Sequence, residues 1–128
     1  PIYGVSVGGT YVEISINQQH MWYYKNGKLV VETDVVTGNY GTNDTPKGAY
    51  SIIYKASPAT LMENSHVTFW LPFTSDGCGI HDASWRASWE YGGTRYKGHG
   101  SHGCVNTPYN AAKKIYNNIS SGTRVVVY

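Results

Sequence analysis

The chain has 128 residues, of which 41% are hydrophobic and only 14% are charged, and its formal net charge is +2. This length and apolar content fit a single domain, residues 1–128, with one core. The weak charge lacks the clustered Lys and Arg of a nucleic-acid-binding protein, and no apolar run approaches the roughly 20 residues of a membrane span. We therefore expect neither a nucleic-acid partner nor membrane contact from this domain.

The chain begins "PIYG", with neither an initiator Met nor a signal peptide, which predicts a fragment of a longer protein. Residues 10–17 then alternate between apolar and other side chains, as a half-buried strand should. Residues 19–36 predict a hairpin, because Asn26-Gly27 lies between two β-rich runs and favours a type I′ turn.

Loops and further strands are predicted in the middle of the chain. Residues 38–48 have the composition of a loop, and strands are predicted at 49–55, 66–73 and, more briefly, 77–82. The segment 82–100 has no clean period of 2 or 3.6, although its "ASWRASW" stretch could form a helical turn. A long irregular segment inside a compact domain is usually a lid or a binding loop.

One helix is well marked. Thr107 is predicted as its N-cap and Pro108 as its first residue. An apolar stripe follows at helical spacing, formed by Tyr109, Ala112, Tyr116 and Ile119. Ser121-Gly122 is expected to end the helix, and residues 123–128 to form a strand. Together the elements predict a mostly-β domain, a sandwich or an open barrel, with one clear helix.

Cys104, in "GHGSHGCVNTP", is the candidate nucleophile. A thiol attacks as a thiolate, so it needs a nearby base or positive charge. On an extended backbone His102 would share a face with Cys104, but the two side chains would run side by side, which does not favour direct proton transfer. His81, at the end of "GCGIH", could approach the sulfur head-on from another strand. Gly103 would let a substrate carbonyl come close to the backbone, and the amides of Gly103 and Cys104 could form an oxyanion hole.

These stretches resemble one known family. "SHGCVN" resembles the signature of the L,D-transpeptidases, a Ser or Thr followed by His-Gly-Cys, an apolar residue and Asn. "GIHD" resembles the segment of the family's other catalytic histidine, "INQQHMWYYKNGKLVVETDVVTG" its amino-terminal hairpin, and "TPKGAYSI" its Thr-Pro-x-Gly segment. The four matches keep the family's order from Val12 to Tyr128. The resemblance implies the family's β-sandwich catalytic domain, with the clear helix after the cysteine.

The resemblance also implies roles for individual residues. Cys104 would be the nucleophile and His81 the general base, oriented by the backbone carbonyl of Asp82. The residues supporting the thiolate or the oxyanion site would be His102, Ser101, Gly103, Asp82 and Asn106. Ser101 and Asn106 are residue types that more often fix loops through backbone hydrogen bonds than take part in chemistry.

The activity implied is that of a thiol enzyme acting on peptidoglycan stem peptides outside the cytoplasm, at the cell wall, without cofactor or metal. The thiolate would attack the carbonyl of the third residue of a tetrapeptide stem, D-Ala would leave, and an acceptor amine would take the acyl group to form a 3→3 cross-link. With water as acceptor, the enzyme would be an L,D-carboxypeptidase. Carbapenem β-lactams are expected to acylate the same thiol, and the export signal or anchor is expected outside this fragment of an exported protein.

The chain departs from the family in one respect, because the interval from His81 to Ser101 is longer than the family's usual spacing. We interpret the excess as an insertion in the aromatic loop around "ASWEYGG". Trp85, Trp89 and Tyr96 of this loop could line a substrate cleft, or they could pack the loop onto the domain.

Other interpretations stay open. His99, His102 and Cys104 are ligand types that zinc accepts, although ligands this close in a Gly-rich backbone rarely give tetrahedral geometry. A papain-like endopeptidase would place its cysteine at a helix start and before its histidine, unlike the order here. A non-catalytic wall-binding module with an aromatic surface would keep its binding after Cys104→Ala. A disulfide between Cys78 and Cys104 would switch activity off, if the demanding geometry were met.

Overall fold

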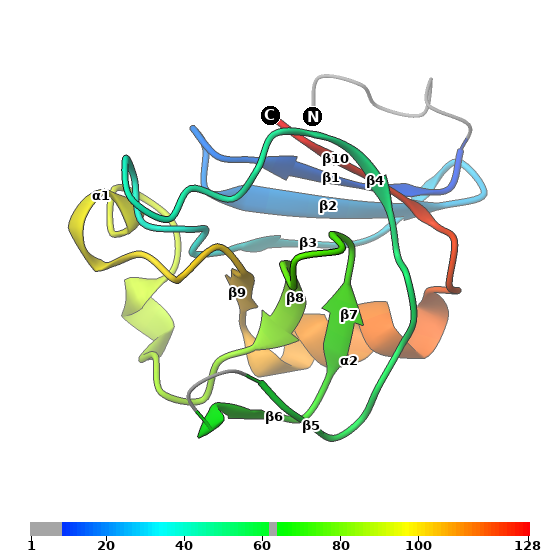
Figure 1. Ribbon diagram of the computed structural model, residues 1–128. Helices are drawn as coiled ribbons and strands as arrows, with labels where there is room; N and C mark the ends of the chain where they lie inside the picture. Colours follow the sequence, from blue (N-terminus) through cyan, green and yellow to red (C-terminus); the bar gives the residue numbers. More distant parts are fainter. Residues whose placement is uncertain (1–8, 62–63) are drawn as a thin grey trace.

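The computed structural model describes residues 9–61 and 64–128, and its main sheet has five strands in the spatial order β3-β2-β1-β10-β4 (Figure 1). The strand bounds are Tyr11–Ser15 (β1), His20–Lys25 (β2), Lys28–Asp34 (β3), Gly48–Ser51 (β4) and Arg124–Val127 (β10). β1 and β10 pair in parallel, with Tyr11 opposite Arg124, and the other pairs are antiparallel. Two strands from distant parts of the sequence therefore meet inside this sheet.

A smaller sheet, in the order β7-β8-β9, carries the candidate catalytic residues. Its strands are Trp70–Pro72 (β7), Gly79–Asp82 (β8) and Val105–Thr107 (β9), and a separate two-stranded ribbon consists of Ala59–Thr60 (β5) and His66–Val67 (β6). β8 is antiparallel to β7 and parallel to β9, so Trp70, His81 and Asn106 form one row across the sheet. Val36 extends this row through a bridge to Asn106.

The helix α2 (Tyr109–Asn118) packs against β3 of the main sheet and β8 of the smaller one, and it runs beneath the main sheet in Figure 1. The core between these layers draws buried side chains from both sheets and the helix: Val12, Ile14, Val125, Val127, Leu71, Ile80, Val105 and Ile115. The predicted mostly-β sandwich with one clear helix is thus confirmed. No helix within the two described ranges is long and apolar enough to cross a bilayer.

The predicted hairpin is confirmed, whereas the expectation of a half-buried first strand is wrong. Asn26 and Gly27 both have positive φ, 53° and 79°, as the two central residues of a type I′ turn require. All five residues of β1 are buried. Glu13 lies on the face of β1 that was expected to be solvated. Its side chain is buried, and its carboxylate accepts hydrogen bonds from the Tyr11 and Tyr128 hydroxyls.

The start of α2 also differs from the prediction by one residue. Pro108 is the N-cap, with φ −55° and ψ 142°, and its carbonyl accepts the first helical hydrogen bond from the Ala112 amide at 2.9 Å. Thr107 stays in β9, and its hydroxyl donates to the Val105 carbonyl at 3.1 Å. Strand pairing with β8 therefore overrides the capping preference of Thr107. The helix ends at Asn118, before the predicted stop at Ser121-Gly122.

Candidate active site

The half-buried Cys104 lies one residue before β9, and its sulfur faces the start of β8. The sulfur donates to the Gly77 carbonyl at 3.5 Å and is also hydrogen-bonded by the Gly79 backbone. Gly79 has no room for a side chain, because a Cβ there would lie 2.7 Å from the Leu71 carbonyl oxygen and from the Pro72 Cα. Glycine at this position therefore lets β7 pack closely against the start of the strand that carries His81.

His81 is the third residue of β8, and its side chain is buried. Its Nδ1 lies 2.7 Å from the Asp82 carbonyl oxygen, which matches the predicted orienting contact. Because a carbonyl can only accept a hydrogen bond, Nδ1 carries the proton of the neutral ring, and Nε2 keeps its lone pair. The centre of its ring lies 5.9 Å from that of Trp70 and 5.7 Å from that of Trp85. His81 is thus a preoriented acceptor for a proton.

Burial sets the resting protonation of both groups. Burial raises the pKa of the Cys104 thiol to about 11, while the Gly79 backbone hydrogen bond opposes the rise and Cys78 adds to it. Burial lowers the pKa of His81 below its usual value, against the opposing hydrogen bond and charge of Asp82. At neutral pH the two groups are therefore a thiol and an uncharged imidazole, so the proton has to leave the sulfur as the sulfur attacks.

The hydrogen bonds of the Asp82 carboxylate go to main-chain amides and not to the His81 ring. It accepts from the Thr68 amide at 2.9 and 3.1 Å and from the Phe69 amide at 2.8 Å. These bonds hold the bend that separates β6 from β7, where the sequence predicts one continuous strand. The side chain of Asp82 thus supports the sheet, and its main-chain carbonyl orients His81.

The signature residues before Cys104 form a tight turn, so the extended backbone considered for His102 and Cys104 is not found. Gly103 has a φ of +121°, which favours glycine, and a Cβ there would lie 3.1 Å from the Cys78 sulfur. Ser101 Oγ donates to the Cys104 carbonyl and accepts from the Gly103 amide at 3.2 Å. The His102 side chain is exposed. Ser101 therefore fixes the loop. Its Oγ accepts from the Gly103 amide, which is one of the two amides expected to form the oxyanion hole.

Thr45 is a buried residue of this site that the sequence did not single out. Its hydroxyl donates to the Gly103 carbonyl at 2.7 Å and accepts from the Gly38 amide at 2.9 Å. The Ser101 amide donates to the Thr37 carbonyl at 3.0 Å, which fastens the same turn from its other end. The signal that could have identified Thr45 is its position as the first residue of "TPKG", the segment that resembles the family's Thr-Pro-x-Gly motif.

Arg86 is a second residue that the sequence did not indicate. It comes from the aromatic loop, and its Nη2 donates to the His99 carbonyl at 2.9 Å. Its Nε donates to Asn106 Oδ1 at 2.7 Å, in the amide orientation that satisfies both groups. Asn106 is buried in the row of His81. Arg86 therefore ties the loop to Asn106 of β9, beside the candidate base.

Arg86→Met is expected to lower the free energy of unfolding by about 1–3 kcal/mol, because it leaves the buried Asn106 amide oxygen without its donor. Urea denaturation measures the effect. Arg86→Lys keeps the positive charge but lacks the planar guanidinium, so it should recover only part of the lost stability. Arg124→Met, at an exposed position of β10, is the matched control and should change stability by less than about 0.5 kcal/mol. Equal stability of the Arg86→Met and Arg124→Met variants would contradict the tie.

The aromatic loop contains two short helical segments, a 3-10 helix at Ser88–Glu90 (η3) and the helix α1 at Tyr96–His99. Ser88 and Trp89 of the 3-10 helix lie within "ASWRASW", where a helical turn is predicted. The expectation that Tyr96 lines a substrate cleft is wrong, because its side chain is 4% exposed and its ring packs edge-on against Tyr40. Trp85 is half exposed beside His81, where a substrate role stays a prediction.

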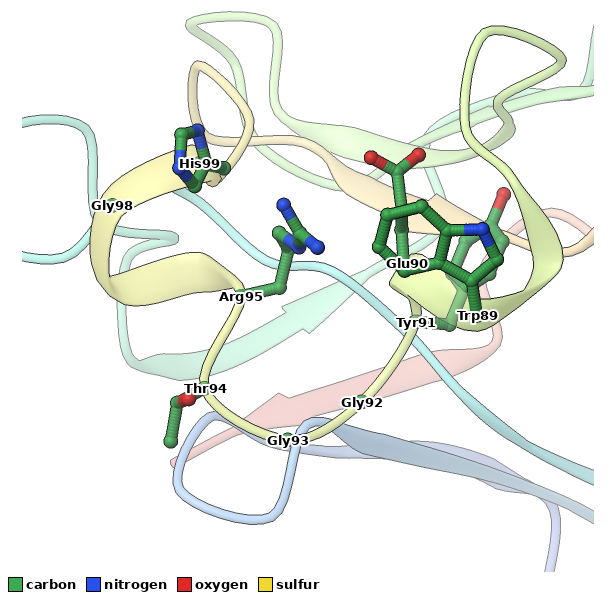
Figure 2. A pocket seen from close by; sticks show the side chains of 9 residues that line it. All are labelled: Trp89, Glu90, Tyr91, Gly92, Gly93, Thr94, Arg95, Gly98 and His99. Atoms are coloured by element: carbon green, nitrogen blue, oxygen red, sulfur yellow. The ribbon is translucent and has the colours of Figure 1, made fainter.

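Trp89 borders a hollow of about 430 Å³ within the same loop (Figure 2). The hollow is lined by Trp89, Glu90, Tyr91, Gly92, Gly93, Thr94, Arg95, Gly98 and His99, a set without Cys104 or His81. The rival interpretation of His99, His102 and Cys104 as zinc ligands finds no support, because the described part of the chain contains no group of three His, Cys, Asp or Glu residues that could hold a metal ion.

Comparison with known proteins places this geometry in a family. The family model of the YkuD L,D-transpeptidase catalytic domain matches residues 9–127. No curated protein sequence matches the chain.

Solved structures of L,D-transpeptidases are similar to this chain in both fold and sequence. A cysteine-to-serine mutant of the Enterococcus faecium L,D-transpeptidase is 41% identical with a TM-score of 0.87, over 94% of this chain and 50% of that one. The catalytic domain of that species' L,D-transpeptidase is 39% identical with a TM-score of 0.78, over 93% of this chain and 96% of that one. The form acylated by ertapenem is 39% identical with a TM-score of 0.77, over 94% of this chain and 97% of that one. The chain thus spans about half of the longer enterococcal chain. From the family match over nearly all of its residues, the chain belongs to the YkuD family of L,D-transpeptidase catalytic domains.

Proposed function

We propose that this domain is a cysteine acyltransferase that forms 3→3 cross-links between peptidoglycan stem peptides outside the cytoplasm. The observation that carries the proposal is the meeting of Cys104 with β8, the strand on which a neutral His81 is oriented by the Asp82 carbonyl. A thiol and a proton acceptor are the minimal parts of nucleophilic acyl transfer.

In the acylation half-reaction, Nε2 of His81 takes the thiol proton as Cys104 attacks the carbonyl of the third stem residue. The tetrahedral intermediate then collapses, the bond to D-Ala breaks, and the imidazolium returns the proton to the departing amine. The products are a thioester on Cys104 and free D-Ala. His81 ends neutral, as it began.

In the second half-reaction, an acceptor amine of another stem attacks the thioester, and His81 takes a proton from that amine. Collapse of this intermediate releases the Cys104 sulfur, which regains a proton, and leaves an amide cross-link. If water attacks, the same steps give a tripeptide, and the domain acts as an L,D-carboxypeptidase.

The residues around the sulfur support these steps. The Cys104 and Gly103 amides are the proposed oxyanion donors, and the Gly103 amide has to exchange its 3.2 Å contact with Ser101 Oγ for the substrate oxygen. His102 and Ser101 support the turn, and the exposed indole of Trp85 borders the approach to His81. Carbapenems are proposed to acylate Cys104, as ertapenem acylates the enterococcal catalytic domain.

Mass spectrometry of the intact protein incubated with a disaccharide-tetrapeptide tests the proposal. We expect a covalent adduct equal to the substrate minus D-Ala, together with a cross-linked dimer in solution. Cys78→Ala is the matched control and should keep both products, whereas Cys104→Ala should lose both. Accumulation of the tripeptide without the dimer would instead identify a carboxypeptidase. Binding without any turnover in wild type and Cys104→Ala alike would identify a wall-binding module and overturn the proposal.

A further inference from the structure

The hollow in the aromatic loop presents an indole beside a guanidinium. Figure 2 shows the Arg95 side chain projecting into the hollow, with His99 on one side and Trp89 and Glu90 on the other. The Arg95 Cζ lies 4.9 Å from the centre of the Trp89 ring. Trp89 is nevertheless 71% exposed, so much of its ring surface stays available to a ligand. An exposed indole fixed by a neighbouring cation is a flat surface on which a sugar ring can stack.

The lining of the hollow carries one guanidinium, that of Arg95, and one carboxylate, that of Glu90. Burial lowers the pKa of the Arg86 guanidinium; the nearby Glu90 and Tyr91 oppose this lowering, and Arg95 adds to it. Arg86 is already engaged with His99 and Asn106. Among the described residues, no carboxylate forms a salt bridge with Arg95. Glu90, the acidic residue of the lining, accepts a hydrogen bond from the Ala87 amide at 2.7 Å.

The hollow is held in shape by bonds to the body of the domain. The Gly92 amide donates to the Val35 carbonyl at 3.0 Å, and the Tyr40 amide donates to the Tyr96 carbonyl at 2.9 Å. Gly92 has a φ of +80°, and a Cβ there would lie 3.0 Å from the Asp34 carboxylate, so this turn of the loop favours glycine. A site with this support exists before its ligand arrives, which lowers the entropic cost of binding.

We infer that this hollow binds a saccharide that carries a carboxylate or a phosphate. The anion enters between Arg95 and His99 and pairs with the Arg95 guanidinium, whose planar donors suit either group. The sugar ring lies on the exposed indole of Trp89. The site is separate from Cys104 and His81, neither of which lines it, so binding requires no turnover. It lies in the aromatic loop between β8 and β9.

NMR titration of the ¹⁵N-labelled domain tests the inference, with the indole Nε1–H signal of Trp89 assigned by its loss in Trp89→Phe. The ligands are N-acetylmuramic acid, N-acetylglucosamine 6-phosphate, neutral N-acetylglucosamine, acetate and inorganic phosphate. We expect at least one acidic sugar to shift this signal with a dissociation constant at least about tenfold lower than that of the neutral sugar. Tighter binding of N-acetylmuramic acid would indicate a carboxylate-bearing glycan as the source of the ligand. Tighter binding of N-acetylglucosamine 6-phosphate would indicate a phosphate-bearing polymer.

Variants separate this site from the catalytic one. Arg95→Gln should abolish the preference for the acidic sugar, whereas Arg124→Gln, at an exposed position of β10, should keep it. Cys104→Ala should bind like the wild type, so that failure of the proposed catalysis and failure of this site give different results. The inference is overturned if the neutral sugar binds as tightly as both acidic sugars, or if acetate or phosphate alone binds as tightly as the sugars. It is also overturned if Arg95→Gln keeps the preference for the acidic sugar, or if Cys104→Ala loses it.

Discussion

Alkylation of Cys104 by iodoacetamide is expected to accelerate about a hundredfold between pH 7 and pH 9. Iodoacetamide reacts with the thiolate, and burial raises the pKa of this thiol to about 11. About one thiol in ten thousand is then ionised at pH 7, and the ionised fraction grows tenfold with each pH unit below the pKa. The rate is measured by the mass of the singly alkylated protein in the Cys78→Ala background, where Cys104 is the remaining cysteine.

The same experiment distinguishes two resting states of the site. A preformed ion pair of thiolate and imidazolium would give fast alkylation that is nearly constant from pH 7 to pH 9. Such a flat profile would contradict the neutral pair described above. The Cys104→Ala protein, which keeps Cys78, measures the background reaction at the second thiol.

Replacement of His81 by glutamine is expected to slow acylation by ertapenem by about 10²–10⁴-fold at pH 7, the usual contribution of a general base. The pH profile should change as well. Burial lowers the pKa of His81, so the wild-type rate should hold through pH 6.5 and fall only at lower pH, where the ring becomes protonated. The variant has no such base, and its rate should follow the thiolate fraction, rising about tenfold per pH unit.

The rate is followed as the growth of the acylated mass under single-turnover conditions. His66→Gln is the matched control, because His66 is exposed in β6 and contacts Thr60 rather than the sulfur. It should react like the wild type. Equal rates for His81→Gln and the wild type would remove His81 from the proposed mechanism.

Local chemistry made several features predictable from the sequence. The hairpin follows from Asn26-Gly27, because those two residues tolerate the positive φ that a type I′ turn needs. The contact between His81 and the Asp82 carbonyl joins neighbouring residues, and the family resemblance implied it before the structure did. The turn at Gly103 likewise depends on a residue type that permits its φ of +121°.

Features that depend on distant partners were predicted poorly. Thr107 is a good N-cap by residue type, but its place opposite Asp82 in the β8–β9 pair decides its conformation. Tyr96 is an aromatic residue in a Gly-rich loop, which fits either a cleft or a packed interior, and the contact with Tyr40 makes it an interior residue. No local pattern marks Arg86, whose role comes from its contacts with Asn106 and the His99 carbonyl.

The parallel pairing of β1 with β10 affects how this domain reaches its folded state. Tyr11 and Arg124 have to meet before the main sheet is continuous, so a contact of very long sequence separation must form during folding. Loops of that size close at an entropic cost, and folding slows as such contacts come to dominate. Until residues 124–127 insert, β1 offers an open edge on which another unfolded copy could add a strand. Dilute conditions should therefore favour correct refolding over aggregation.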